Sequence, residues 1–157
     1  MSREQPEIER FESSAPQETR AIAAQIGRQL KPGDLIALQG NLGAGKTVIA
    51  QGLAHGLGVD ENEVVRSPTF SLFNIHQGDR PLVHVDLYRI GDPDEVEALG
   101  LLDLLPDHVM AVEWFEQAHG LLGEPALVIE IDDVDDAPEK RSIKCSWYER
   151  RVKTARP

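Results

Sequence analysis

The sequence predicts an α/β fold, in which a mixed, mostly parallel sheet lies between two layers of helices. Segments with helical and strand periodicity alternate along the chain. Residues 35–38 and 109–112 are short apolar runs of the kind buried in parallel sheets, and a glycine-rich segment joins the first of them to a helix. The 157 residues suit one compact domain, expected over residues 1–147, with a basic tail at residues 148–157.

The first half of the chain contains two predicted helices with a strand between them. Residues 14–17 have the form of a capping box, which predicts Ser14 as the N-cap of the first helix. The apolar residues of that helix recur at helical spacing, and a proline-glycine turn ends it. After the first buried strand, a second helix begins near Lys46 and is expected to end at Gly58.

The second half is predicted to contain a hairpin, a helix and further strands. Residues 69–76 and 82–88 flank a five-residue loop with turn residues, which is typical of a β-hairpin. An acidic segment with a proline near its first turn starts a helix at residue 92. Three strands are expected after that helix, at residues 109–112, 126–131 and 142–147.

The charge of the chain is unevenly distributed. Of its 16 basic and 27 acidic side chains, seven basic and two acidic ones lie in residues 137–157, which leaves nine basic and 25 acidic ones elsewhere. An acidic body repels a phosphate backbone, which disfavours nucleic-acid binding by the body and leaves the basic tail as a contact for RNA or an acidic partner, or as a solvated terminus. The acidic run at residues 132–136 lacks the glycine and the terminal glutamate of a calcium loop and is predicted to be a solvated turn.

Composition excludes several classes of protein. No run approaches the roughly 18 apolar residues of a membrane helix, and the glutamate-rich beginning of the chain does not resemble a signal peptide. The single Cys145 rules out an internal disulfide framework and a four-cysteine zinc site. We therefore expect a soluble, cytoplasmic protein without membrane contact.

Residues 40–47 match the pattern G-x-x-x-x-G-K-[ST] of a phosphate-binding loop, between a predicted strand and a predicted helix. Glycines in such a loop let backbone N–H groups turn onto phosphate oxygens, next to the positive end of the helix dipole. Lys46 supplies a charge between the β- and γ-phosphates, and the Thr47 hydroxyl is a ligand for Mg²⁺. The sequence therefore predicts a P-loop NTPase-like fold that binds a nucleoside triphosphate. The residues expected around it are Asn41, Leu42, Gly43, Ala44, Gly45, Lys46, Thr47 and Val48.

Two acidic residues, Asp86 and Glu113, lie at the ends of predicted strands. Because Mg²⁺ prefers oxygen ligands, each is a candidate, with Thr47, for the metal site, or for orienting the attacking water. Together with Lys46 they form the predicted catalytic group. The chain lacks the N-K-x-D and D-x-x-G motifs of GTPases, which favours ATP over GTP.

With further motifs, the sequence resembles TsaE, a family of bacterial P-loop ATPases of tRNA threonylcarbamoyladenosine biosynthesis. Besides the phosphate-binding loop, it carries S-P-T-F, H-V-D-L-Y-R and E-W at residues 67–70, 84–89 and 113–114. The resemblance spans roughly residues 12–131. It implies an ATPase that uses ATP and Mg²⁺, is slow by itself and acts with the protein subunits TsaD and TsaB, while another subunit holds most of the tRNA.

The resemblance also implies roles for residues outside the phosphate-binding loop. Thr69, in a switch-like segment, would sense the γ-phosphate, and the adenine would lie near Pro16 and Thr19. Asp86 and Glu113 match the residues that the family uses for metal binding and hydrolysis. Packing and contact with partners both stay open for the other signature residues, His84, Tyr88, Arg89 and Trp114.

Three positions depart from the family's pattern without removing a catalytic group. Asn41 replaces the usual aspartate, Val48 a common second threonine, and Phe115 the proline that often follows E-W. The source of an arginine finger stays open between Arg66, Arg89 and a partner. Two other functions stay open as well: a small-molecule P-loop kinase, and an interaction module controlled by nucleotide in which hydrolysis is incidental.

Overall fold

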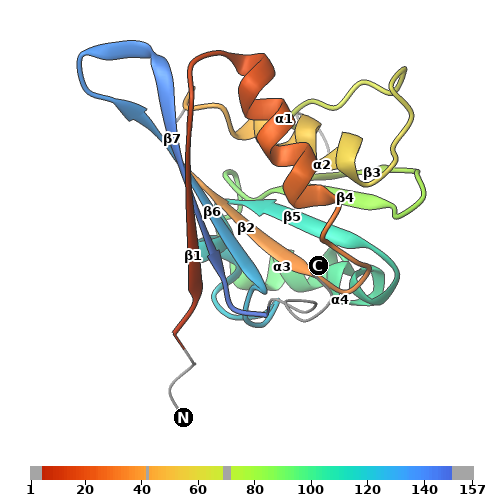
Figure 1. Ribbon diagram of the computed structural model, residues 1–157. Coiled ribbons are helices and arrows are strands. Elements are labelled where there is room, and N and C mark those ends of the chain that lie inside the picture. Colours follow the sequence, from red (N-terminus) through yellow and green to blue (C-terminus); the bar gives the residue numbers. More distant parts are fainter. Residues whose placement is uncertain (1–4, 42, 69–71, 150–157) are drawn as a thin grey trace.

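The computed structural model describes residues 5–41, 43–68 and 72–149 (Figure 1). Its elements are β1 (Glu7–Ser13), α1 (Pro16–Gly27), β2 (Leu35–Gln39), α2 (Lys46–Gly56), β3 (Phe73–His76), β4 (Leu82–Asp86), α3 (Pro93–Ala98), α4 (Leu101–Leu104), η1 (Leu105–Asp107), β5 (Val109–Glu113), η2 (Phe115–Ala118), β6 (Leu127–Val134) and β7 (Ala137–Trp147). The strands form one sheet in the order β1-β7-β6-β2-β5-β4-β3. Strands β6, β2, β5 and β4 are parallel to one another, while β1, β7 and β3 pair antiparallel at its two sides. The predicted α/β class with a mixed sheet is confirmed.

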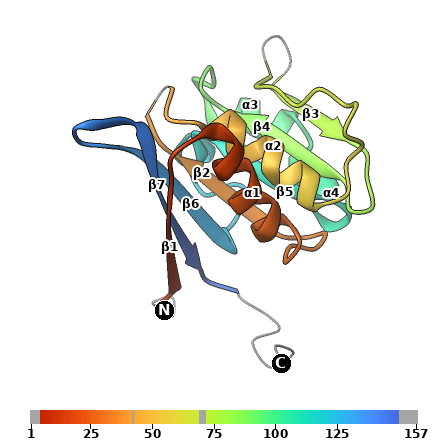
Figure 2. The same ribbon diagram turned by 45° about the horizontal axis from the view of Figure 1, so that its top comes forward.

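Helices cover both faces of the sheet, as Figures 1 and 2 show from two directions. Strand residues alternate between the two faces, so each buried strand contributes to two cores. One core joins α1 and α2 to the sheet and includes Ile26 and Leu53, and the other includes Val96 of α3 and Leu101 of α4. The sheet therefore lies in the middle of three layers, as predicted.

Helices α1 and α2 approach each other closely because glycines lie where they cross. A Cβ atom added to Gly52 would lie 2.5 Å from the Cβ atom of Ala23. One added to Gly56 would lie 2.2 Å from the carbonyl oxygen of Ala24. Close packing of this kind leaves no room for a larger side chain, so these glycines fix the position of α2 against α1.

The C-terminal ends of α1 and α2 are joined by Arg80, from the turn between β3 and β4. Its Nη1 atom donates hydrogen bonds to the carbonyl oxygens of Leu30 at 2.6 Å and Arg28 at 3.1 Å. Its Nη2 atom donates to the carbonyl oxygen of Gly56 at 2.9 Å. The last carbonyls of a helix lack partners within the helix and carry the negative end of its dipole, so one guanidinium satisfies both helix ends.

The first helix begins later than the capping box predicts. Its N-cap is Ala15, in an extended conformation, and no side chain caps it; Ser14 as the N-cap is therefore wrong. The reason is Pro16, which occupies the first helical position. A residue before proline is driven out of the helical conformation, so Ala15 has to lie outside the helix.

Strand β1 is absent from the sequence-based prediction, and the final hairpin is longer than predicted. β1 pairs with β7 over its whole length. Strands β6 and β7 extend beyond the predicted segments, so the acidic run contributes three residues, 132–134, to β6 and only Asp135 and Asp136 to the turn. Cys145 is buried in β7, as expected for a packed residue.

The predicted hairpin forms between β3 and β4, with β4 ending at Asp86. The beginning of its first predicted arm, residues 69–71, lies outside the described residues. Of the predicted basic tail, Tyr148 and Glu149 continue from β7, and residues 150–157 are likewise outside the described part. Within the described ranges, no helix combines the length and the apolar character needed to cross a membrane.

Candidate functional site

The glycine-rich loop connects the carboxyl end of β2 to the start of α2. Gly45 is the N-cap of α2 with a φ of 116°, a left-handed conformation that favours glycine. Gly40 packs against β6, where an added Cβ atom would lie 2.5 Å from the carbonyl oxygen of Ile131. The Ala44 N–H donates to the carbonyl oxygen of Asn41 at 3.0 Å, which closes the loop. Leu42 is outside the described residues.

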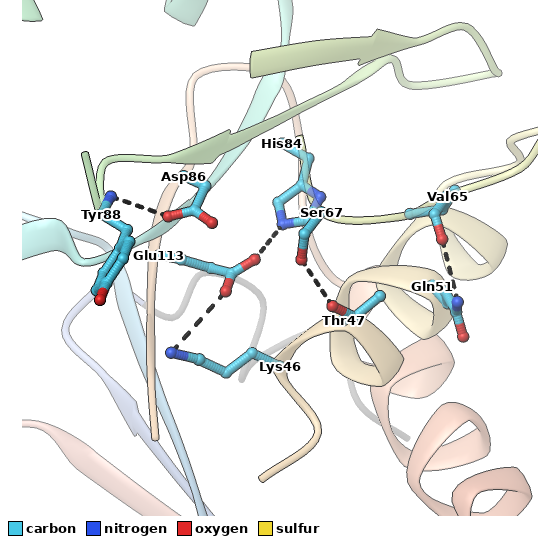
Figure 3. Close-up of polar contacts among 9 residues, drawn as sticks. All are labelled: Lys46, Thr47, Gln51, Val65, Ser67, His84, Asp86, Tyr88 and Glu113. Atoms are coloured by element: carbon cyan, nitrogen blue, oxygen red, sulfur yellow. Dashed lines mark hydrogen bonds and ion pairs between the residues drawn. The ribbon is translucent and has the colours of Figure 1, made fainter. Parts of the chain in front are cut away.

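Lys46 is the first residue of α2, and its side chain is turned inward. The residue is only 7% exposed, and its Nζ atom lies 3.9 Å from Oε1 of Glu113 (Figure 3). The ammonium group also lies 5.2 Å from the centre of a ring of Trp114. A buried ammonium held by a carboxylate and an aromatic face is positioned to meet a phosphate that enters the loop.

Glu113 ends the buried strand β5 and has two charged or polar neighbours. Its Oε2 atom lies 2.7 Å from Nε2 of His84, while its Oε1 atom faces Lys46 (Figure 3). A carboxylate only accepts hydrogen bonds, so His84 carries a proton on Nε2. His84 is 0% exposed, and its Nδ1 atom has no partner among the described residues. Its full burial supports packing, one of the two roles left open for His84.

Asp86 ends β4 directly beside Glu113, because the two residues are paired in the parallel register of β4 and β5. Its Oδ1 atom accepts a hydrogen bond from the Tyr88 N–H at 2.9 Å. Burial raises the pKa of Asp86 above its ordinary value; the Tyr88 N–H opposes this effect, and the charge of Glu113 adds to it.

The two carboxylates and the hydroxyl of Thr47 form an oxygen donor set that suits Mg²⁺. Among the described residues there is no group of three or more His, Cys, Asp or Glu side chains that could hold a metal ion. Two carboxylates and one hydroxyl leave the remaining ligands of such an ion to be supplied by phosphate or water.

The segment before β3 is fastened to α2 by two hydrogen bonds. The Ser67 and Thr47 hydroxyl oxygens lie 2.8 Å apart, and the Gln51 amide donates to the carbonyl oxygen of Val65 at 3.0 Å (Figure 3). Thr47, the predicted metal ligand, is thus already engaged by the first residue of the switch-like segment. Thr69, the expected sensor of the γ-phosphate, is outside the described residues.

A cavity of about 390 Å³ opens beside the glycine-rich loop. It is lined on one side by Pro16 and Thr19 of α1, the two residues expected near adenine. On the other side it is lined by residues of the loop and of α2, and β6 and β7 complete the wall. The lining residues from the predicted phosphate-binding set are Gly43, Ala44, Gly45 and Val48. The structure therefore brings these two predicted groups to one cavity.

The chain turns sharply after Glu113. Trp114 has a φ of 58°, uncommon for a bulky residue, and Phe115 begins the short helix η2. The ring of Trp114 lies 5.0 Å from that of Tyr88, which is 54% exposed. The left-handed backbone at Trp114 places its ring beside the Lys46 ammonium.

The two arginines predicted as candidates for an arginine finger differ from a third arginine, which contacts the glycine-rich loop. Arg66 and Arg89, the two candidates for an arginine finger, are exposed. Arg141 of β7 was not among the predicted site residues, yet it lines the cavity and donates from Nε to the carbonyl oxygen of Ala44 at 3.0 Å. No local pattern marks Arg141, because it meets the loop only through the pairing of β7 with β6 and β1.

Comparisons with known proteins agree with this architecture. The family model for TsaE, described as a threonylcarbamoyl adenosine biosynthesis protein, matches residues 13–143. The tRNA threonylcarbamoyladenosine biosynthesis protein TsaE of Streptomyces coelicolor is 42% identical over 142 residues, which cover 87% of this chain and 95% of that protein. Its namesake from Bacillus subtilis is 41% identical over 123 residues, 77% of this chain and 75% of that protein.

A solved structure also matches along almost the whole length. The crystal structure of Bacillus subtilis YdiB has a TM-score of 0.76 and 30% sequence identity, covering 96% of this chain and 93% of that one. The family model, the similar sequences and the solved structure agree, and the chain belongs to the TsaE family.

Proposed function

We propose that this chain is an ATP-hydrolysing subunit in the synthesis of tRNA N6-threonylcarbamoyladenosine, the process for which its family is named. One observation supports the ATPase above all others. The glycine-rich loop, Lys46 and the carboxylates of Asp86 and Glu113 meet at the carboxyl edge of the parallel strands. This edge is where α/β proteins bind their ligands, and the four features are those needed to hold a phosphate chain and its metal ion.

The loop and the start of α2 would bind the triphosphate. Backbone N–H groups at the helix start and the Lys46 ammonium neutralise phosphate charge. Thr47 would hold Mg²⁺ directly, with Asp86 and Glu113 acting directly or through its water ligands. The bound ion would supply further neutralisation of the phosphate oxygens. Pro16 and Thr19 would contact the nucleoside end, where they line the cavity.

Glu113 would orient the attacking water. His84 holds the Oε2 atom at 2.7 Å, so the carboxylate keeps a fixed orientation. When phosphate oxygens take over the Lys46 ammonium, the Oε1 atom is released to accept a hydrogen bond from water. Positioning of this kind supplies most of the catalysis in phosphoryl transfer, where the protein forms no covalent bond.

The proposal includes TsaD and TsaB as the protein partners and the cytoplasm as the location. The acidic charge of the chain supports a division of labour in which another subunit holds the tRNA. A single small P-loop domain is expected to hydrolyse ATP slowly until partners complete its site.

Calorimetry and phosphate release test the ATPase. We expect heat of binding with ATP and Mg²⁺, and a hydrolysis rate that falls about 100-fold in Glu113→Gln while ATP still binds. Glu116→Gln, which changes an exposed carboxylate three residues away, is the matched control and should hydrolyse ATP like wild type. The proposed site would be refuted by a wild-type protein that shows no binding even with TsaD and TsaB present.

Multi-turnover tRNA modification tests the cellular role. TsaD, TsaB and the threonylcarbamoyl donor should modify tRNA through many turnovers only with this protein. A Glu113→Gln variant that supports full turnover would indicate an interaction module in place of a hydrolysis-driven subunit. Transfer of labelled phosphate from ATP to an added metabolite would indicate a kinase.

A further inference from the structure

Arg141 reaches the phosphate-binding loop from β7, 97 residues further along the chain than Ala44, which it contacts. It lies in the β6–β7 hairpin, which projects beyond the sheet near the turn between β1 and α1 (Figures 1 and 2). In the sheet, Arg141 is opposite Ser13 of β1 and Asp133 of β6. Pairing on both sides therefore fixes the backbone from which its side chain extends.

The guanidinium of Arg141 is held in one orientation by several groups. Its Nη1 atom donates to the carbonyl oxygens of Pro138 at 2.7 Å and Lys140 at 2.8 Å. Its Nε atom donates to the carbonyl oxygen of Ala44 at 3.0 Å and lies 3.4 Å from Oδ1 of Asp133. A planar group with donors fixed on two edges determines the direction of the carbonyl that it binds.

That direction has a consequence for the neighbouring amide. The peptide between Ala44 and Gly45 is planar and trans, so its C=O and its N–H point in opposite directions. Arg141 holds the C=O on the side of β7, which turns the Gly45 N–H to the other side. Within the described part of the chain, no group accepts a hydrogen bond from this N–H. An unused donor at a helix start, beside a buried ammonium, is what an incoming phosphate oxygen requires.

We infer that Arg141 is a positioning residue of the phosphate-binding loop, which holds the Ala44–Gly45 peptide so that the Gly45 N–H donates to the phosphates of the nucleotide. Arg141 acts through that peptide, because its Nε atom donates to the carbonyl oxygen of Ala44 and its Nη1 atom to those of Pro138 and Lys140. The inference rests on the proposed function, since it assumes that the loop binds a polyphosphate. It makes the β6–β7 hairpin part of the nucleotide site.

The test compares three ligands on full-length variants by calorimetry: ATP, ADP and inorganic tripolyphosphate, each with Mg²⁺. Arg141→Ala should weaken all three by about tenfold, because one hydrogen bond to a charged phosphate is lost in each case. Arg141→Lys keeps the charge but cannot reproduce the fixed fork, so its affinities should lie between those of wild type and Arg141→Ala. Lys140→Ala removes the same charge one residue away and should bind all three ligands like wild type.

Three results would overturn the inference. One is equal affinities in Arg141→Ala and wild type. Another is an Arg141→Lys variant that binds like wild type, which would show that charge alone matters. The third is a loss for ATP and ADP without a loss for tripolyphosphate, which would show a contact with the nucleoside. Melting temperatures and circular dichroism identify a variant that fails to fold. If Arg141→Ala fails to fold, the affinities of Arg141→Lys decide whether the inference holds. If wild type binds none of the ligands, the proposed function fails.

Discussion

Glycines lie near both ends of α2, but they leave space near its start and allow close packing against α1 at its end. Near its start, Gly43 leaves space: nothing lies within 4 Å of a Cβ atom added there. At its end, Gly56 is pressed against α1, where an added Cβ atom would lie 2.2 Å from the Ala24 carbonyl oxygen. The start also carries a buried ammonium 3.9 Å from the carboxylate of Glu113, whereas at the end Arg80 donates to the carbonyl oxygen of Gly56.

This difference shows how a small domain combines an adaptable site with a rigid frame. Backbone N–H groups at the start of the helix keep the orientation that a ligand requires only if the helix itself does not move. Glycine contacts with α1 and the Arg80 hydrogen bonds provide that rigidity at the far end, away from the chemistry. Substitutions at the two ends should therefore separate ligand binding from stability.

The largest expected effect is at the start of α2. Lys46→Ala removes the ammonium group that lies 3.9 Å from Glu113 and that would meet the phosphates. We expect binding of ATP with Mg²⁺ to fall below detection in calorimetry and hydrolysis to be lost, while the protein stays folded. Lys144→Ala, which removes a surface cation paired with Glu130, is the control and should change neither. Unchanged ATPase activity in Lys46→Ala would contradict the site.

A pair of glycine substitutions should give crossed effects. Gly56→Ala overpacks the crossing with α1 and is expected to cost about 1–3 kcal/mol of unfolding free energy, without weakening ATP binding to the folded protein. Gly43→Ala has space but a φ of 82°, so it should cost about 1 kcal/mol and weaken ATP binding. Urea unfolding and calorimetry measure the two effects. Equal losses of affinity in both variants would remove the distinction between the ends.

Arg80→Ala should lower stability without changing the site. Its removal leaves the carbonyls of Leu30 and Gly56 without their donor, which is expected to cost about 1–3 kcal/mol in urea unfolding. The affinity of the folded protein for ATP should remain that of wild type. A control is Arg28→Ala, an exposed position at the end of α1. If Arg80→Ala lowers ATP affinity while its unfolding midpoint is unchanged, Arg80 acts on the nucleotide site and the stabilising role given to it here is incorrect.

The last prediction concerns Asp34, at the start of β2 and far from the loop. Burial, and secondarily the charge of Glu149, raise the pKa of Asp34 from 3.8 to about 6. Because the folded state then binds its proton more tightly than the unfolded state, this group adds stability as the pH falls through 6 toward 4.

Asp34→Asn removes that dependence. In the wild type the Lys31 N–H donates to Oδ2 of Asp34 at 2.9 Å. Asparagine keeps an oxygen that can accept this hydrogen bond, so the turn should still form. We expect the variant to unfold at higher urea than wild type near pH 8, with the difference shrinking toward pH 4. Asp103→Asn, an exposed position, should show no such trend. A variant less stable than wild type at pH 8 would contradict the sign.

The parts that the sequence predicted well depend on local patterns. Residues 40–47 carry their own motif, and Asp86 and Glu113 follow apolar runs, so parallel pairing brings them to one edge. Strand β1 escaped prediction because its apolar Ile8 is exposed, while Glu9 lies on the inner side and accepts a hydrogen bond from the indole of Trp147. The strand that pairs with β1 is far away in the sequence, and the residues of β1 do not show the alternation of apolar and polar residues that predicts a strand.

Other features are set by partners remote in sequence. Arg80 and Arg141 look like ordinary surface cations until the fold brings backbone carbonyls to them. His84 looked as suitable for an interface as for the interior, because its burial depends on strands at both sides of β4. Ser14 failed as an N-cap for a local reason, since the influence of Pro16 outweighed the capping box.

The pairing of β7 also determines the order of events during synthesis. The ribosome makes β1 and the phosphate-binding loop before β7, the strand that pairs with β1 and supplies Arg141. Until β7 has been made, β1 lacks its neighbouring strand and the carbonyl of Ala44 lacks its donor. A nascent chain that ends before β7 therefore lacks a group that orients the phosphate-binding loop, and its unpaired β1 has to stay free of aggregation in the meantime.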